Sequence, residues 1–248
     1  MLQCKLCGGK CAEATEKEAK QVVELIKTSK EFAHLQTYAH YYPFCPKCGA
    51  AYFDFNEQQI EILKLNAEAI KQIYADKTFL KADPNKFALN CECAGYTFEL
   101  VGMHSEAAFA YAAAADMLNL CLVKYLADNK ETILKTLGDP IDYTKLNDFE
   151  VYKNCMERID ILRRLALGHV IETKSNQTNH LFLYVSLVID FNKAELALQT
   201  LDQLESCNYE WLTEPSIVNT IQVLRNKAQD LIDATTIAID VDKQQNNE

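Results

Sequence analysis

Glycine and proline are scarce in this chain, which limits both its fold and its chemistry. Only 7 glycines and 5 prolines occur in 248 residues, and these residues most often end helices and form turns. Strand-like alternation is nearly absent outside two short cysteine-containing segments. The sequence therefore predicts a mostly α protein with short loops. It also has no glycine-rich phosphate loop, Gly-x-Ser-x-Gly motif or His-Glu-x-x-His motif, so we expect that the protein is not an enzyme.

Long hydrophobic runs and a secretion signal are missing as well. The two longest apolar stretches, 107–115 and 181–189, have nine residues each, whereas a membrane-spanning helix needs roughly 20. The first residues show no apolar segment followed by a small-residue cleavage site. We therefore expect a soluble, cytoplasmic protein whose ten cysteines are not paired in a secreted disulfide scaffold.

An excess of positive charge, which is typical of nucleic-acid-binding proteins, is also missing. The formal net charge is −10, and all of it arises after residue 85, because lysines and acidic residues balance before that point. This charge repels phosphate backbones. Lys5, Lys10 and Lys47 flank the cysteine motifs, so a nucleic-acid-associated zinc ribbon stays as an alternative interpretation.

Two Cys-x-x-Cys-Gly motifs are the strongest chemical signal in the chain. They run from Cys4 to Gly8 and from Cys45 to Gly49. Two cysteines this close in sequence bind one ion across a tight turn, and the glycine allows the positive φ that such a turn needs. Four sulfurs at about 2.3 Å suit zinc, with rubredoxin-type iron as the alternative. The predicted metal ligands are Cys4, Cys7, Cys45 and Cys48.

The two motifs are predicted to close a small zinc-ribbon-like β module. A shell of four cysteines leaves no position for water, so we expect structural zinc. The intervening residues show helical spacing over 14–36, which predicts an inserted helix. After the second motif, Ala51–Phe55 is predicted to form a short strand, and Asn56 is predicted to cap a helix that continues to Tyr74. We place this module at residues 1–82.

The remainder of the chain is predicted to form an antiparallel helical array over residues 83–240, followed by a polar tail over 241–248. Asp83 and Pro84 indicate a helix start. From residue 88 the sequence follows the register of a tetratricopeptide repeat (TPR), in which small Gly95 would face Tyr111 across a turn at 102–104. Later helices are predicted at 149–167, 181–189, 194–204 and 217–237, after an interruption over 139–148.

These two motifs followed by helices in TPR register resemble a bacterial family of uncharacterised zinc-ribbon proteins with TPR-like helices. The resemblance rests on the four motif cysteines and on Ala94, Gly95, Phe98, Ala107, Tyr111 and Ala114. It implies a non-enzymatic scaffold or adaptor that docks a protein or peptide partner through its helices. Neither a membrane nor a nucleic acid is the expected partner.

Glu31 and His34 carry the alternative enzyme hypothesis. They form a Glu-x-x-His pair, the helical spacing with which diiron bundles supply ligands. Together with the cysteine site they would give an iron-binding redox protein. A diiron site also needs a second such pair, and none occurs in the chain.

Four further residues have two interpretations each. Cys11 is either a bystander or a substitute ligand and redox partner for the motif cysteines. Arg163 and Arg164 either pair with acidic residues of their own helix or bind a carboxylate of a docked peptide. Trp211 is either a buried plug or an exposed docking anchor.

Overall fold

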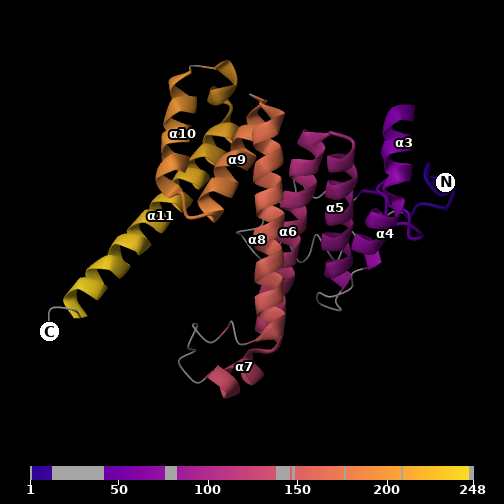
Figure 1. Cartoon of the computed structure of the whole chain (residues 1–248). Coiled ribbons are helices and arrows are strands. Elements are labelled where there is room, and N and C mark those ends of the chain that lie inside the picture. Colours follow the sequence, from indigo (N-terminus) through magenta and orange to yellow (C-terminus); the bar gives the residue numbers. More distant parts are fainter. Residues whose placement is uncertain are drawn as a thin grey trace. The chain divides into compact units, whose positions relative to one another are not determined.

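The computed structural model describes residues 2–12, 42–75, 83–137, 146, 149–175, 177–207 and 209–245. Within these residues the protein is mostly α, as the sequence predicts, with nine α-helices packed antiparallel (Figure 1). The predicted helix over 14–36 lies outside the described residues, as does most of 139–148. The helices are α3 (Glu57–Leu65), α4 (Ala67–Ala75), α5 (Asp83–Leu100), α6 (His104–Asp128), α7 (Lys130–Leu137), α8 (Glu150–Thr173), α9 (Thr178–Asp190), α10 (Ala194–Ser206) and α11 (Pro215–Gln245), with a 3-10 helix, η3 (Glu210–Thr213).

The chain forms two compact units, Met1–Glu172 (unit 1) and Thr173–Glu248 (unit 2). Unit 1 contains the cysteine motifs and nearly all of α3 to α8, and unit 2 contains α9 to α11. The predicted domain boundary after residue 82 stays a prediction. Helix α11 ends at Gln245, beyond the predicted start of the polar tail at residue 241.

The segment after the second cysteine motif differs from the prediction in two ways. Asn56 caps α3 as predicted, because its side chain accepts a hydrogen bond from the Gln59 amide (2.9 Å) while the Gln59 side chain accepts one from Asn56 (3.0 Å). The predicted single helix to Tyr74 is nevertheless two helices that meet at Asn66. The Asn66 side chain donates to the Ile62 carbonyl (2.9 Å), a local bond that favours a helix end over continuation.

No strand forms in the described residues, so the predicted strand at Ala51–Phe55 is absent. In place of the predicted zinc-ribbon-like β module there are only isolated bridges. These join Gln3 to Lys10, Ala12 to Phe44, and Phe44 to Ala51. The rings of Phe53 and Phe55 instead pack on Phe98 of α5, with centroid distances of 5.2 and 6.1 Å. Burial of these rings against a helix replaces the pairing of a strand.

Helices α5 and α6 form the central hairpin of unit 1, as predicted. Gly102, in the turn, has a φ of 72°, and the Met103 amide donates to the Phe98 carbonyl (2.9 Å). A Cβ atom on Gly95 would lie 2.7 Å from Cδ1 of Tyr111, so the two helices approach closely at this glycine. The predicted contact between Gly95 and the Tyr111 ring is confirmed.

Helix α6 supplies more of the described core of unit 1 than any other helix. Among the described residues it is the one helix long and apolar enough, by length and composition, to cross a membrane. However, 72% of its most apolar window is buried inside the protein, as is usual for the central helix of a core.

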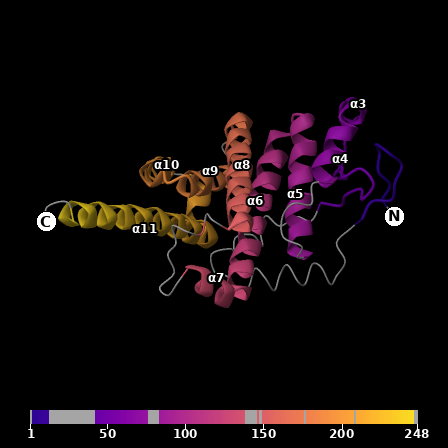
Figure 2. The same cartoon turned by 60° about the horizontal axis from the view of Figure 1, so that its bottom comes forward.

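Helix α8 lies next to α6 (Figure 2), and ion pairs join it to both α5 and α6. Arg158 pairs with Glu92 of α5, and Arg163 Nη2 lies 4.0 Å from Asp116 Oδ1 of α6. Because Arg163 points to a neighbouring helix, it makes a contact within the fold. Arg164 pairs with Asp160 on its own helix at 2.7 Å, which confirms the first interpretation for this residue.

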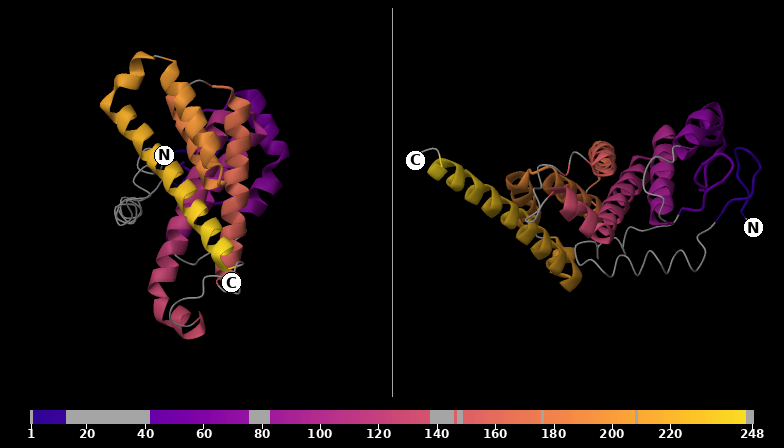
Figure 3. Two further views of the ribbon diagram at one scale, coloured as in Figure 1. Left: turned by 90° about the vertical axis from the view of Figure 1, so that its left-hand side faces the viewer. Right: turned by 90° about the horizontal axis from the view of Figure 1, so that it is seen from below.

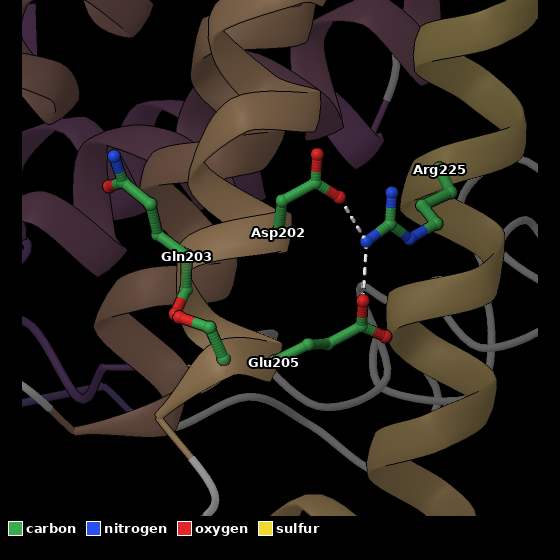
Figure 4. Close-up of polar contacts among 5 residues, drawn as sticks. Asp202, Gln203, Glu205 and Arg225 are labelled. Atoms are coloured by element: carbon green, nitrogen blue, oxygen red, sulfur yellow. Dashed lines mark hydrogen bonds and ion pairs between the residues drawn. The ribbon is translucent and has the colours of Figure 1, made fainter.

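In unit 2, α9, α10 and α11 pack on one another. Arg225 of α11 donates to both Asp202 (2.6 Å) and Glu205 of α10 (Figure 4). Helix α11 extends well beyond α10 toward the C-terminus (Figure 3).

We expect Gly95→Ala to destabilise the protein by about 1–3 kcal/mol, because the added methyl group would overlap the Tyr111 ring. Gly168→Ala in α8 is the matched control, since a Cβ there would meet nothing within 4 Å. In the control we expect a gain of up to about 1 kcal/mol from helix propensity. Urea unfolding followed by circular dichroism measures both, and equal effects of the two substitutions would contradict the close approach.

Candidate metal centre

The first cysteine motif folds into a tight turn held by its own backbone. The Cys4 amide donates to the Gly9 carbonyl (2.7 Å), and the Gly8 amide donates to the Cys4 carbonyl (2.9 Å). Gly8 has a φ of 68°, the left-handed conformation that glycine adopts without strain. The turn brings Cys4 and Cys7 to one side of the chain, and we call it the first knuckle (residues 4–9).

The second motif repeats this arrangement, and we call it the second knuckle (residues 45–50). The Cys45 amide donates to the Ala50 carbonyl (2.9 Å), and the Gly49 amide donates to the Cys45 carbonyl (2.7 Å). Gly49 has a φ of 75°. The same hydrogen bonds at the same spacing show that each motif encodes its turn locally.

The two knuckles bring their four sulfur atoms together. The Sγ atoms of Cys4, Cys7, Cys45 and Cys48 all lie within 4.8 Å of one another. Across the knuckles, Cys7 and Cys45 are 3.4 Å apart and Cys4 and Cys48 are 3.7 Å apart. A tetrahedron with zinc–sulfur bonds of about 2.3 Å has edges of about 3.8 Å, whereas a disulfide bond measures about 2.05 Å. The cluster could therefore hold a metal ion such as zinc.

Burial and electrostatics also suit a bound cation. Cys4, Cys45 and Cys48 are buried and Cys7 is half-buried. The hydrogen bond from Cys48 lowers the pKa of Cys4 to about 5, and the same bond raises the pKa of Cys48. Burial is the main cause that raises the pKa of Cys45. Since the crowded thiolates repel one another, a divalent cation that replaces their protons stabilises all four together.

Two residues lie against the sulfur cluster without belonging to it. A Cβ atom on Gly9 would lie 3.2 Å from the Cys45 sulfur and 3.3 Å from the Cys7 sulfur. Cys11 is 5% exposed, and burial, followed by the charges of the cluster, raises its pKa to about 11. Cys11 is outside the four-sulfur group, as expected for a bystander. The close packing at Gly9 was not predicted, because it depends on the approach of the second knuckle.

The second knuckle is also docked on the helices of unit 1. A side chain on Gly49 would overlap Tyr74 of α4. The Asn90 side chain of α5 donates to the Tyr42 carbonyl (2.7 Å), and the ring of Tyr42 packs edge-on against Phe98 (5.3 Å). The metal centre is therefore continuous with the helical core.

The remaining candidate residues lie either outside the described residues or in unit 2. Glu31 and His34 lie outside the described residues. Trp211 lies in η3 of unit 2, where it is half-buried and its ring stacks on Tyr209 (5.3 Å, 11°). The other cysteines are unpaired thiols, of which Cys91, Cys93, Cys121 and Cys155 are buried and Cys207 is exposed.

A second polar cluster, which the sequence did not reveal, lies where α5, α6 and α8 meet. It consists of Glu99, His104, Tyr111 and His169, and we call it the histidine cluster. Its two histidines are 65 positions apart, so no local pattern could have identified it.

No family model matches the chain, and no curated protein or solved structure matches it either. The family resemblance inferred from the motifs is thus supported only by the four-cysteine cluster and the helical fold.

We expect Gly49→Ala to destabilise the protein by about 3 kcal/mol or more, because left-handed strain adds to the overlap with Tyr74. Gly102→Ala is the matched control, since its φ of 72° is similar but a Cβ there meets nothing within 4 Å. The control should lose only the strain, about 1–2 kcal/mol. Urea unfolding measures both, and an equal loss would show that Tyr74 does not pack on the knuckle.

Proposed function

We propose that the protein is a non-enzymatic scaffold or adaptor in which structural zinc holds the N-terminal segment on a helical array that binds another protein. The observation that carries this proposal is the four-sulfur cluster, with its two close sulfur pairs each formed across the knuckles. A metal ion in this position crosslinks segments that are about 40 residues apart in sequence, closing a long loop that the backbone bridges alone hold weakly.

The donor set favours a structural role for the metal. Four cysteine ligands complete a tetrahedral shell, which leaves no position at which zinc could activate water. Zinc is favoured over iron because four cysteine thiolates in a closed tetrahedral shell are a characteristic ligand set of structural zinc. We propose a cytoplasmic location because a reducing compartment keeps the thiols available for the metal.

The proposed TPR-like arrangement supports protein binding. The hairpin of α5 and α6 and the hairpin of α9 and α10 are the kind of unit that TPR-like arrays use to dock peptides. In unit 2 the stacked pair of Tyr209 and Trp211 offers an aromatic anchor, because Tyr209 is 42% exposed. Aromatic side chains of this kind often dominate the energy of protein interfaces.

We expect protein purified without added metal to contain one zinc ion per chain and no coloured iron, measured by inductively coupled plasma mass spectrometry. Cys45→Ser should lose this zinc and loosen the N-terminal segment while the helices of unit 2 stay folded. Cys207→Ser is the control, since this exposed thiol is outside the cluster and should leave the zinc content unchanged. Zinc retained by Cys45→Ser would overturn the ligand assignment, and iron would support the redox alternative.

We expect Tyr209→Ala to weaken binding of the partner protein by about tenfold or more without changing zinc content or helicity. Val223→Ala in α11 is the control, because Val223 is similarly exposed at 45% but lies outside the aromatic pair. Affinity capture compared between the two variants identifies the partner, and fluorescence of Trp211, the one tryptophan in the chain, then measures its affinity. Equal binding by both variants would exclude the aromatic pair as the anchor.

A further inference from the structure

The histidine cluster joins three helices of unit 1 through polar contacts. His104 Nδ1 of α6 and His169 Nδ1 of α8 are 2.9 Å apart. On its other side, His169 Nε2 lies 3.6 Å from Glu99 Oε2 of α5. The Tyr111 hydroxyl donates to the same Glu99 oxygen at 2.5 Å. The four side chains therefore form one continuous polar chain across the junction.

The two imidazole rings face each other through their Nδ1 atoms. Their centroids are 5.2 Å apart. This distance exceeds the 2.9 Å between the two Nδ1 atoms by about two ring radii, so both nitrogens lie between the rings. In such a pair one nitrogen must donate and the other must accept. The contact needs one proton shared between the two Nδ1 atoms, and it is lost when each Nδ1 carries a proton of its own.

Glu99 assigns the two roles. Its Oε2 faces His169 Nε2, so a neutral His169 ring carries its proton on Nε2 and accepts a hydrogen bond at Nδ1. His104 then donates through its own Nδ1.

Glu99 of α5 places a negative charge beside His169. Tyr111 of α6 stacks on His169 (5.7 Å, 17°), and burial together with Glu99 raises the pKa of Tyr111, so this hydroxyl stays neutral and donates. Glu106 on α6 and Glu172 on α8 are the next carboxylates along the two helices.

We propose that His104 and His169 form a pH-sensitive latch that fastens the C-terminal end of α8 to the hairpin of α5 and α6. Acidification that puts a proton on both Nδ1 atoms places two N–H groups and two positive charges face to face. The contact then breaks and the end of α8 loosens. Stability contributed by the latch is thus present at higher pH and is lost as the pH falls.

The latch acts where unit 1 ends. His169 is three residues before Glu172, the last residue of that unit. Acidification therefore loosens the last residues of unit 1. This inference does not depend on the proposed zinc or on the proposed partner.

A double-mutant cycle tests the latch. His104→Ala, His169→Ala and the double variant are unfolded in urea at about pH 7.5 and about pH 5, and the coupling is read as a ratio of folding constants. We expect a coupling of roughly threefold to tenfold at the higher pH and none, or repulsion, at the lower. The cycle cancels any effect of pH on zinc binding, because that effect is common to all four proteins.

The matched control is the same cycle on Arg163 and Asp116, which also join α8 to α6 but contain no histidine. Its coupling should be the same at both pH values. A histidine coupling that is absent at the higher pH, or unchanged at the lower, overturns the proposal.

Nuclear magnetic resonance of the unsubstituted protein gives a second test that does not depend on whether the variants fold. Imidazole nitrogen shifts at about pH 7.5 should show one protonated and one unprotonated Nδ1 in the pair. At about pH 5 both should be protonated, and the backbone signals of residues 169–172 should move at the same midpoint. Full protonation of both rings with unchanged backbone signals would overturn the latch.

Discussion

The N-terminal part of unit 1 depends on one contact, the approach of the two knuckles through their sulfur atoms. Each knuckle is a closed turn with its own hydrogen bonds and a left-handed glycine, so each forms locally. Among the described residues, the bridges between Ala12, Phe44 and Ala51 are too few to make a sheet that would hold the knuckles together. A cation bound by the four cysteines would supply this long-range attraction. Tyr42 and Phe53, on either side of the second knuckle, pack on Phe98 of α5.

A second constraint organises the rest of unit 1, and it is steric. Gly95 lets the Tyr111 ring approach α5, and the position of that ring fixes its hydroxyl beside Glu99. Glu99 in turn faces His169 of α8. A single small residue in α5 therefore determines both the packing of the central hairpin and the position of the carboxylate that orients the histidine cluster. Enlarging Gly95 should disturb the cluster as well as the core.

The sequence predicted those features whose signal is local. The knuckle turns, the cap at Asn56, the contact of Gly95 with Tyr111 and the helices α8 to α11 follow from spacing, glycine and apolar periodicity. It did not predict the break at Asn66, because the sequence alone does not show whether an interior asparagine side chain bonds back to the preceding turn. The strand expected at Ala51–Phe55 does not form, and the rings of Phe53 and Phe55 pack against Phe98 of α5 instead. The histidine cluster and the ion pair of Arg158 with Glu92 join residues about 65 positions apart, and no pattern within one segment encodes such partners.

The two polar centres of unit 1 differ in how their charge is balanced, which separates their roles. At the knuckles, four cysteine thiols surround a space that a divalent cation could occupy, so the contact would be permanent once a metal is bound. At the histidine cluster, the contact depends on how many protons the two facing nitrogens carry between them. The first arrangement suits a permanent crosslink and the second suits a reversible one. Because the reversible contact lies at the end of α8, near the last residue of unit 1, the fold places its fixed and its adjustable connections at opposite ends of that unit's sequence.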